Sequence, residues 1–260
     1  MDIIDCSGSL QTGIPFPVEE YHADGQALQT DGLLPCSQDV NVLVNGKPRL
    51  TLSCVPDHIV DAVMGRLFLE GDISHVLGAL MANIGAAGRT VYVQMSRAVL
   101  PQDGWPAIAE KLKTALGADG DVGRSSLEPK PWNPDHLIVL ADGFEKQLGG
   151  AARLRGIHSC ALAAADDIMY LRSDLDSEAA LDKVVGAAFV DGVDISECTL
   201  VTNAPLGVGM FARMLHASIG TVLSLACPTE QAVALARLCR ITLVDAPEPG
   251  CIRVLHDATA

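Results

Sequence analysis

The chain has 260 residues, which is long enough for a substantial hydrophobic core and for either one large domain or two modest ones. Its net charge of −14 and pI near 4.7 argue against non-specific binding to nucleic acids or anionic membranes, because both surfaces would repel the protein at long range. Aromatic residues make up only 4% of the sequence, which disfavours RNA-type base stacking and favours close packing of helices on a sheet.

The sequence also predicts a cytoplasmic protein. No segment reaches the ~18 uncharged apolar residues that span a bilayer, since the longest candidate, residues 199–227, is interrupted by Arg213 and His216. The first residues carry acids where a secretory leader would carry positive charge. Eight cysteines are scattered through apolar segments without a C-x-x-C pair, a pattern that indicates reduced, buried thiols. Neither membrane insertion nor a directly bound metal is expected.

The amino-terminal part is predicted to be a small α+β domain over residues 1–118. Residues 1–38 are polar, with glycines, prolines and acids interspersed, and are expected to form an irregular arm or an edge strand. A hairpin is predicted to turn at Asn45-Gly46, since this pair tolerates the positive φ of a tight turn. The elements expected here are strands over 40–44 and 49–53, a helix over 56–70 that Gly71 ends, a strand over 90–95 and a helix over 106–116.

Glycines and prolines cluster between residues 117 and 134, which places a linker over 119–134 and a second domain over 135–260. Asn133-Pro134-Asp135 is typical of a helix start. The elements expected after the linker are a helix to about 148, strands near 159–165 and 168–172, a helix over 178–190, an alternating block over 198–245 and a last strand over 252–255.

The alternating block contains strand, helix, strand, helix, strand, with strands at 199–202 and 221–225 and a first helix opened by Pro205. Strands that alternate with helices predict a parallel sheet. Pro228 suits the first turn of the second helix, and Glu230 suits its positive end. Helix amino termini that follow parallel strands lie along one sheet edge, where their N–H groups can bind an anion. We therefore expect a site for a phosphate-bearing ligand there.

Several short blocks occur in order along the chain. In the amino-terminal half they are Val44-Asn45-Gly46, Val55-Pro56-Asp57 and Leu69-Glu70-Gly71. In the carboxy-terminal half they are residues 156–162 (GIHSCAL), residues 180–186 (ALDKVVG) and the helix after Pro228 that leads into a TLV strand at 242–244. Together, over about residues 40–256, they resemble the FdhD family of formate dehydrogenase accessory proteins, with its VNG, TPxDL, EGI, GxHAAAL and NAxDKxxG blocks and its APT-opened helix.

This resemblance implies that the protein is a sulfur carrier. Family members accept sulfur from a cysteine desulfurase as a cysteine persulfide, and pass it to the molybdenum bis(guanine dinucleotide) cofactor of formate dehydrogenase. The resemblance also implies an α/β fold, with a cytidine-deaminase-like three-layer α/β/α domain and a smaller amino-terminal α+β domain, and a homodimer.

The sequence departs from this family where sulfur is carried. Asp119 and Val122 stand at the positions of the two cysteines of the family's CGxCG loop, and neither side chain can form the thiolate that holds sulfane sulfur. The usual persulfide chemistry is therefore excluded at these two positions. Cationic and imidazole groups that the family carries are also replaced, by Ala204, Ser177 and Glu178. In the turn at residues 245–248, an acid stands where the family has an arginine. We therefore expect this region to repel an anionic dinucleotide.

Candidate ligand-binding residues follow from the resemblance and from the predicted helix end. The cofactor-binding candidates are His158, Asn203, Lys183, Pro228 and Thr229. For Lys183 and its neighbour Asp182, the ordinary interpretation is a surface ion pair or a dimer contact. Cys160 is a candidate for a relocated nucleophile, although its alanine-rich setting is typical of an inert core thiol.

Our preferred hypothesis is a divergent FdhD-like protein that serves maturation of the molybdenum bis(guanine dinucleotide) cofactor as a cofactor-binding accessory or chaperone. Its expected partners are a cysteine desulfurase, a formate dehydrogenase or a cysteine-bearing paralogue that supplies the missing thiols. Two alternatives stay open: a sulfurtransferase that uses Cys160, and a non-catalytic small-ligand binding or regulatory module on the same fold. Whether the protein is an enzyme is left open.

Overall fold

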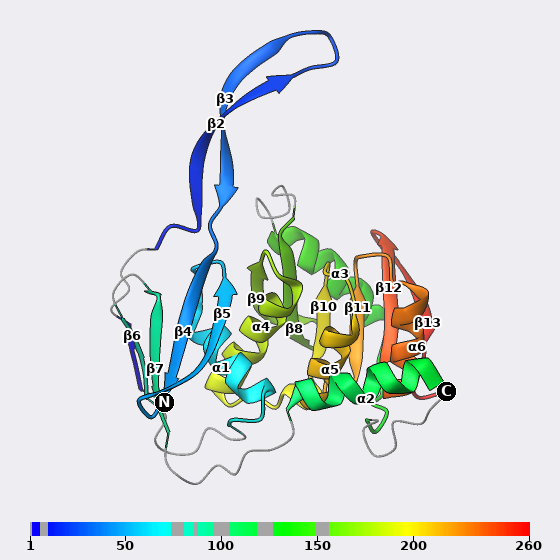
Figure 1. Cartoon of the computed structure of the whole chain (residues 1–260). Helices are drawn as coiled ribbons and strands as arrows, with labels where there is room; N and C mark the ends of the chain where they lie inside the picture. Colours follow the sequence, from blue (N-terminus) through cyan, green and yellow to red (C-terminus); the bar gives the residue numbers. More distant parts are fainter. Residues whose placement is uncertain are drawn as a thin grey trace.

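A computed structural model describes residues 2–5, 10–73, 81–85, 88–95, 104–118, 127–148 and 156–260 of the chain. Within these residues the protein has a mixed α/β architecture (Figure 1), as the sequence predicts. Six strands form one sheet, five form a second sheet, and two form a separate hairpin.

The six-stranded sheet has the order β13-β12-β11-β10-β8-β9. Its centre is the parallel set that the alternating block predicts: β10 (Thr199–Thr202), β11 (Thr221–Ser224) and β12 (Thr242–Glu248). Short, fully buried runs of β-branched and aliphatic residues are typical of parallel strands that helices cover on both faces. Antiparallel strands border this centre on both sides, namely β8 (His158–Ala164) with β9 (Asp167–Asp174), and β13 (Cys251–His256).

Helices cover both faces of this sheet. On one face lies α3 (Pro134–Leu148), whose Leu137, Leu140 and Phe144 pack on Val201 and Val244. The other face carries three helices, which bury the opposite side chains of the same strands: α4 (Ser177–Asp191), α5 (Val208–His216) and α6 (Glu230–Cys239). A further helix, α2 (Trp105–Ala118), packs against α5 and α6 along the lower side of Figure 1.

The five-stranded sheet has the order β1-β6-β7-β4-β5. Its strands are β1 (Asp2–Asp5), β6 (Met81–Ile84), β7 (Thr90–Gln94), β4 (Gln38–Val44) and β5 (Lys47–Cys54). Asn45 and Gly46 make the predicted tight turn between β4 and β5, with φ of 49° and 78°. Buried residues of β4 and β5 alternate with exposed ones, so only one face of this sheet contributes to the core.

Helix α1 (Ile59–Leu69) joins the two sheets, because it packs on α4 and shares one continuous hydrophobic core with both. It begins three residues later than the sequence predicts. His58 precedes it in a left-handed conformation with φ of 48°, which cannot belong to a right-handed helix. The predicted division into domains at 119–134 stays a prediction.

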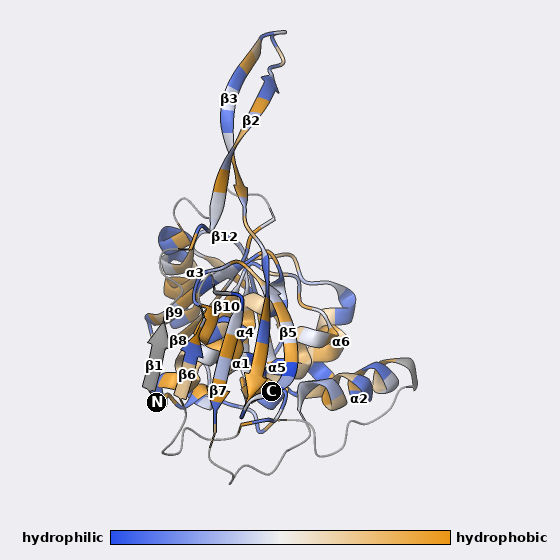
Figure 2. Cartoon of the chain, turned by 60° about the vertical axis from the view of Figure 1, so that its left-hand side comes forward, coloured by the Kyte–Doolittle hydropathy of each residue, from blue (hydrophilic) through white to orange (hydrophobic). Residues whose placement is uncertain are grey.

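A long hairpin of β2 (Gly13–Tyr21) and β3 (Ala27–Pro35) extends away from the body in Figures 1 and 2. The prediction of an irregular arm is therefore wrong for these residues, since nine consecutive residue pairs form a regular antiparallel ladder. The alternative, an edge strand, is confirmed for β1, which lies at the edge of the five-stranded sheet. The exposed side chains of Ile14, Phe16, Leu28 and Leu34 lie on one face of this hairpin, because they occupy alternate positions of paired strands.

Across the described ranges, none of the helices combines the length and the apolar character that crossing a membrane requires.

Candidate functional site

The site lies at the carboxyl edge of the six-stranded sheet. The parallel strands β10 and β11 end there, and the chain then turns into the amino termini of α5 and α6. Strands β8 and β13 run in the opposite direction, so their first residues, His158 and Cys251, lie at the same edge. This arrangement brings most of the residues predicted from the sequence to one side of the sheet.

His158 and Asn203 lie close together at this edge. The Ser159 backbone N–H donates to Asn203 Oδ1 at 2.7 Å, and the Asn203 N–H donates to the Ser159 carbonyl at 3.3 Å. Both His158 and Asn203 are half-buried. The Asn203 amide oxygen is thus engaged in tying β8 to the end of β10, and the His158 ring belongs to the first residue of β8 at the same edge.

The start of α6 differs by two residues from the prediction. Thr229 is the N-cap in extended conformation, and its Oγ1 accepts a hydrogen bond from the Ala232 N–H at 3.1 Å. Pro228 therefore precedes the cap, and its predicted place in the first helical turn is wrong. Thr229, Glu230 and Gln231 are exposed, so the N–H groups of residues 230 and 231 lie at the solvent-exposed positive end of the helix, whereas that of Ala232 is used by the cap.

Lys183 is completely buried, which contradicts the predicted surface ion pair or dimer contact. Its ammonium group pairs with Asp174 at 2.9 Å and with Asp57, and it donates to the carbonyls of Val55 (3.1 Å) and Ser173 (3.2 Å). These four acceptors use all the donors of an ammonium group. In this structure Lys183 therefore fixes the segment before α1 to the end of β9. Its partner Asp174 pairs with His158 in the β8–β9 register.

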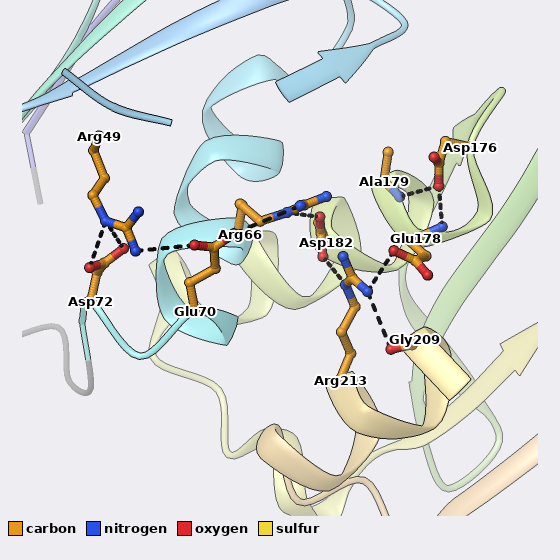
Figure 3. A network of polar contacts seen from close by, with 10 residues as sticks. All are labelled: Arg49, Arg66, Glu70, Asp72, Asp176, Glu178, Ala179, Asp182, Gly209 and Arg213. Carbon is orange, nitrogen blue, oxygen red and sulfur yellow. Dashed lines mark hydrogen bonds and ion pairs between the residues drawn. The ribbon is translucent and has the colours of Figure 1, made fainter. Parts of the chain in front are cut away.

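Asp182 is also buried and lies in a network of charges between α1, α4 and α5 (Figure 3). Its carboxylate accepts from Arg66 Nε at 2.6 Å and from Arg213 Nε at 2.9 Å. The fully buried Arg213 guanidinium stacks at 3.8 Å from the Trp105 ring centroid. Arg213 also pairs with Glu178 at 2.7 Å. The acid at 178, which replaces an imidazole of the family pattern, is thus neutralised within the protein.

A second acid proves to be neutralised as well. Asp245 stands opposite Arg253 across β12 and β13, and Arg253 Nε donates to Asp245 Oδ2 at 3.0 Å. Because the cross-strand arginine compensates this buried carboxylate, the repulsion predicted at Asp245 is reduced, and the exposed acid that stays at the edge is Glu248.

Cys160 lies inside the core, where its Sγ is 3.3 Å from Thr202 Oγ1. Burial raises the pKa of the Cys160 thiol to about 12, so the side chain is a protonated core residue near neutral pH. Among the cysteines in the described part of the chain, Cys227 alone is exposed, and Cys36 and Cys251 are half-buried. Residues 119–126, and with them Asp119 and Val122, lie outside the described residues.

Sequence reasoning missed three contributors to this region: Asp57, Asp174 and Arg253. Their roles depend on contacts with residues far away in the sequence, and a strand pattern alone does not reveal such contacts. The described residues contain no group of three or more His, Cys, Asp or Glu side chains placed to hold a metal ion.

Comparisons with known proteins agree on one family. The profile described as the FdhD/NarQ family matches residues 35–259, so the β2–β3 hairpin precedes the matched region. The chain is 22% identical over 247 residues to the Sulfur carrier protein FdhD of Bacillus subtilis, covering 90% of this chain and 92% of that protein. It is 24% identical over 215 residues to the protein of the same name from Listeria innocua, covering 79% and 82%.

A solved structure has the same fold over nearly the whole chain. It is the crystal structure of a protein from Desulfotalea psychrophila that is provisionally named a formate dehydrogenase accessory protein. The TM-score is 0.73 at 16% sequence identity, and the match covers 95% of this chain and 97% of that one. The likeness to a cytidine deaminase stays a prediction.

Proposed function

Because the chain belongs to the FdhD/NarQ family, we propose that it is a sulfur carrier that serves formate dehydrogenase maturation and that it binds the guanine dinucleotide form of the molybdenum cofactor as its substrate. One observation carries the binding part of this proposal. A helix amino terminus, the exposed hydroxyl of Thr229 and the half-buried polar groups of His158 and Asn203 share one sheet edge.

The residues present at this edge fit a nucleotide. The N–H groups at the start of α6 suit a phosphate, since they supply donors and the positive end of the helix dipole. The His158 imidazole and the Asn203 amide suit the base or the ribose, because each can donate a hydrogen bond. Two of the nearby acids are paired with arginines, so the charge of the edge is less negative than the sequence indicates.

The protein's own contribution to chemistry here is to bind and orient the dinucleotide. Lys183 and Asp182 lie below the surface and are fully engaged with protein groups, so we assign them to supporting the edge and not to touching the ligand. A cysteine persulfide would supply the sulfur.

Guanosine diphosphate binding tests the proposal. A ligand that binds only the native state stabilises it by about 2.7 kcal/mol at a hundred times its Kd, which corresponds to a rise in Tm of about 5 °C for a chain of this size. We expect such a rise, with Kd measured by calorimetry, because the diphosphate occupies the α6 amino terminus. Absence of any shift at millimolar nucleotide contradicts the binding role.

A pair of variants at one position localises the binding. Thr229→Asp keeps a good N-cap and favours the helix dipole, but it places a carboxylate where the phosphate is expected. It should weaken guanosine diphosphate binding at least about tenfold while Tm without ligand stays near the wild-type value. Thr229→Ser keeps both the cap and the charge, and should bind like the wild type. Equal affinity of the two variants would place the nucleotide elsewhere.

A further inference from the structure

A sulfur carrier needs a thiolate that a donor can reach, and most described cysteines do not meet this condition. Cys54, Cys160, Cys198 and Cys239 are buried. Burial raises the pKa of Cys54, Cys160 and Cys239 to about 12 and that of Cys198 to about 11, which keeps these thiols protonated. The exposed Cys227 and the half-buried Cys251 remain at the sheet edge described above.

The strand register places these two cysteines at the same edge of the sheet, after β11 and on β13, which flank β12. Ser224, Asp245 and Arg253 form one row across β11, β12 and β13. Cys227 follows Ser224 by three residues, beyond the carboxyl end of β11. Cys251 precedes Arg253 by two residues on an antiparallel strand, so it also lies beyond this row on the carboxyl side, opposite Glu248.

The two cysteines also lie on the same face of the sheet. Ile252 packs with the α3 side, so its neighbours Cys251 and Arg253 point to the opposite face, which carries α6. Leu255, two residues after Arg253, packs into the core on that opposite face. Cys227 belongs to the loop that enters α6. The Cys251 side chain and the segment that carries Cys227 therefore lie on the α6 side of the carboxyl edge.

Arg253 lies between these elements and keeps part of its side chain in solvent, with 57% of it exposed. Its hydrogen bond to Asp245 is the largest cause that raises the pKa of Arg253, and the electrostatic influence of Cys227 and Cys251 acts in the same direction. Arg253 is two residues from Cys251 on β13, and its side chain points to the same face of the sheet as that of Cys251.

We propose that Cys227, with Arg253 and Cys251 at the same sheet edge, is the thiol that accepts sulfane sulfur in this chain, in place of the family's cysteine loop. This inference rests on the proposed function as a sulfur carrier. In the transfer step, the Cys227 thiolate attacks the terminal sulfur of a donor persulfide. The donor S–S bond breaks, the donor leaves as a thiolate, and a new S–S bond forms on Cys227.

This step needs no oxidant, because the sulfane sulfur keeps its oxidation state and only changes its thiol partner. By the same displacement the Cys251 thiolate can take the terminal sulfur from Cys227, with Cys227 leaving as the thiolate. We assign Arg253 as a positioning residue, because Asp245 holds its guanidinium on the face and at the edge of the sheet where both cysteines lie, and its side chain is partly exposed.

Mass spectrometry of the full chain tests the proposal. The protein is treated with a cysteine desulfurase and its cysteine substrate, and separately with glutathione persulfide, and digested peptides are searched for the gain of one sulfur atom, about 32 Da. We expect the added sulfur on Cys227 or Cys251, its loss in Cys227→Ser, and its retention in Cys36→Ser and Cys6→Ser. If the added sulfur is found on Cys6 or Cys36, and Cys227→Ser does not reduce it, the assignment of Cys227 is overturned but the carrier function is not. Sulfur on no cysteine contradicts the carrier function itself.

A second pair of variants separates the role of Arg253 from simple exposure of the thiol. Arg253→Gln should slow sulfur uptake by Cys227 about tenfold near neutral pH, because the thiolate loses its cation. Arg253→Lys should restore most of the rate. Circular dichroism shows whether both variants keep the fold. Equal uptake rates in the Gln and Lys variants would overturn the assignment of Arg253.

Discussion

Gly65 of α1 and Gly186 of α4 meet backbone to backbone at the crossing of the two helices. A Cβ atom on Gly186 would lie 1.8 Å from the Asp61 carbonyl oxygen and 2.6 Å from the Gly65 nitrogen. A Cβ atom on Gly65 would lie 1.8 Å from the Asp182 carbonyl oxygen. Only glycine permits this approach, and it holds α1 and its preceding segment against the α4 residues that carry Lys183 and Asp182.

The first prediction concerns this crossing. Gly186→Ala should lower the free energy of unfolding by at least about 3 kcal/mol, because the methyl group can be accommodated only by moving backbone. Chemical denaturation measures the change. Gly143→Ala is the matched control within a helix: its Cβ would meet only Ile168 at an ordinary 3.7 Å, so it should stabilise the protein by about 0.5–1 kcal/mol. Similar effects of the two substitutions would refute the close-contact explanation.

The parts of the fold that could be predicted from sequence are those fixed by local pattern. The strands and helices of residues 198–245 were predictable because short apolar runs alternate with amphipathic segments. The helix starts were predicted less well, since α5 begins at Val208 after the Gly207 N-cap and not at Pro205. The β4–β5 turn was predictable because Asn45-Gly46 adopts positive φ at little cost. The long β2–β3 ladder was missed because its glycines, prolines and acids resemble those of a loop.

The second prediction concerns the charges around Asp182. Asp182→Asn leaves Arg213, which is fully buried, without its carboxylate partner at Nε, and it weakens the link to Arg66. Removing one partner of a buried pair costs about 3–5 kcal/mol, and we expect a loss of this size in urea denaturation. The control is Lys113→Ala, which breaks an exposed pair with Glu110 and should change stability by less than about 0.5 kcal/mol. A loss below about 1 kcal/mol for Asp182→Asn would contradict the network in Figure 3.

The burial of Asp182 and Lys183 could not be predicted, because a charged pair inside a helix pattern usually faces solvent. Their partners come from segments that are distant in the sequence, such as Asp57, Arg66 and Arg213. The pairing of β12 with β13 could not be predicted from the sequence either, and this pairing places Arg253 opposite Asp245, whose charge it neutralises. Spacing on the last strand could have placed Cys251 and Arg253 on one face, but it could not have brought Cys227 to them.

The third prediction concerns alkaline pH. Burial raises the pKa of Cys160 to about 12 in the folded protein, from an ordinary value of 9.0. Between these two pH values the unfolded chain loses the thiol proton and the folded chain keeps it, so the stability falls as pH rises from 9 toward 12. One such group contributes a slope of about 1.4 kcal/mol per pH unit in this window.

Denaturation at pH 8 to 11 measures how the free energy of unfolding changes with pH. In Cys160→Ala this slope should be smaller by the contribution of one thiol. Val201→Ala is a control from the neighbouring strand, because it opens a cavity in the same sheet without removing a titrating group. It should lower stability at every pH and leave the slope unchanged. An unaltered slope in Cys160→Ala would show that this thiol titrates normally in the folded state.

The fourth prediction concerns Lys183 and Asp174, which are both buried and 2.9 Å apart. Lys183→Met removes the cation from beneath the site edge and leaves the Asp174 carboxylate buried with the Val55 N–H as a remaining donor. We expect a loss of about 3–5 kcal/mol in the free energy of unfolding. Adding Asp174→Asn should recover part of that loss, since an amide is less costly to bury than an unpaired carboxylate.

A double-mutant cycle of Lys183→Met and Asp174→Asn gives the interaction directly, and we expect a coupling of about 1–3 kcal/mol. Because Asp174 pairs with His158 across β8 and β9, the single variant should also weaken guanosine diphosphate binding through movement of this edge. The double variant should bind more tightly than Lys183→Met alone. Strict additivity of the two stability changes would mean that Lys183 and Asp174 act independently, and that the site edge does not depend on their ion pair.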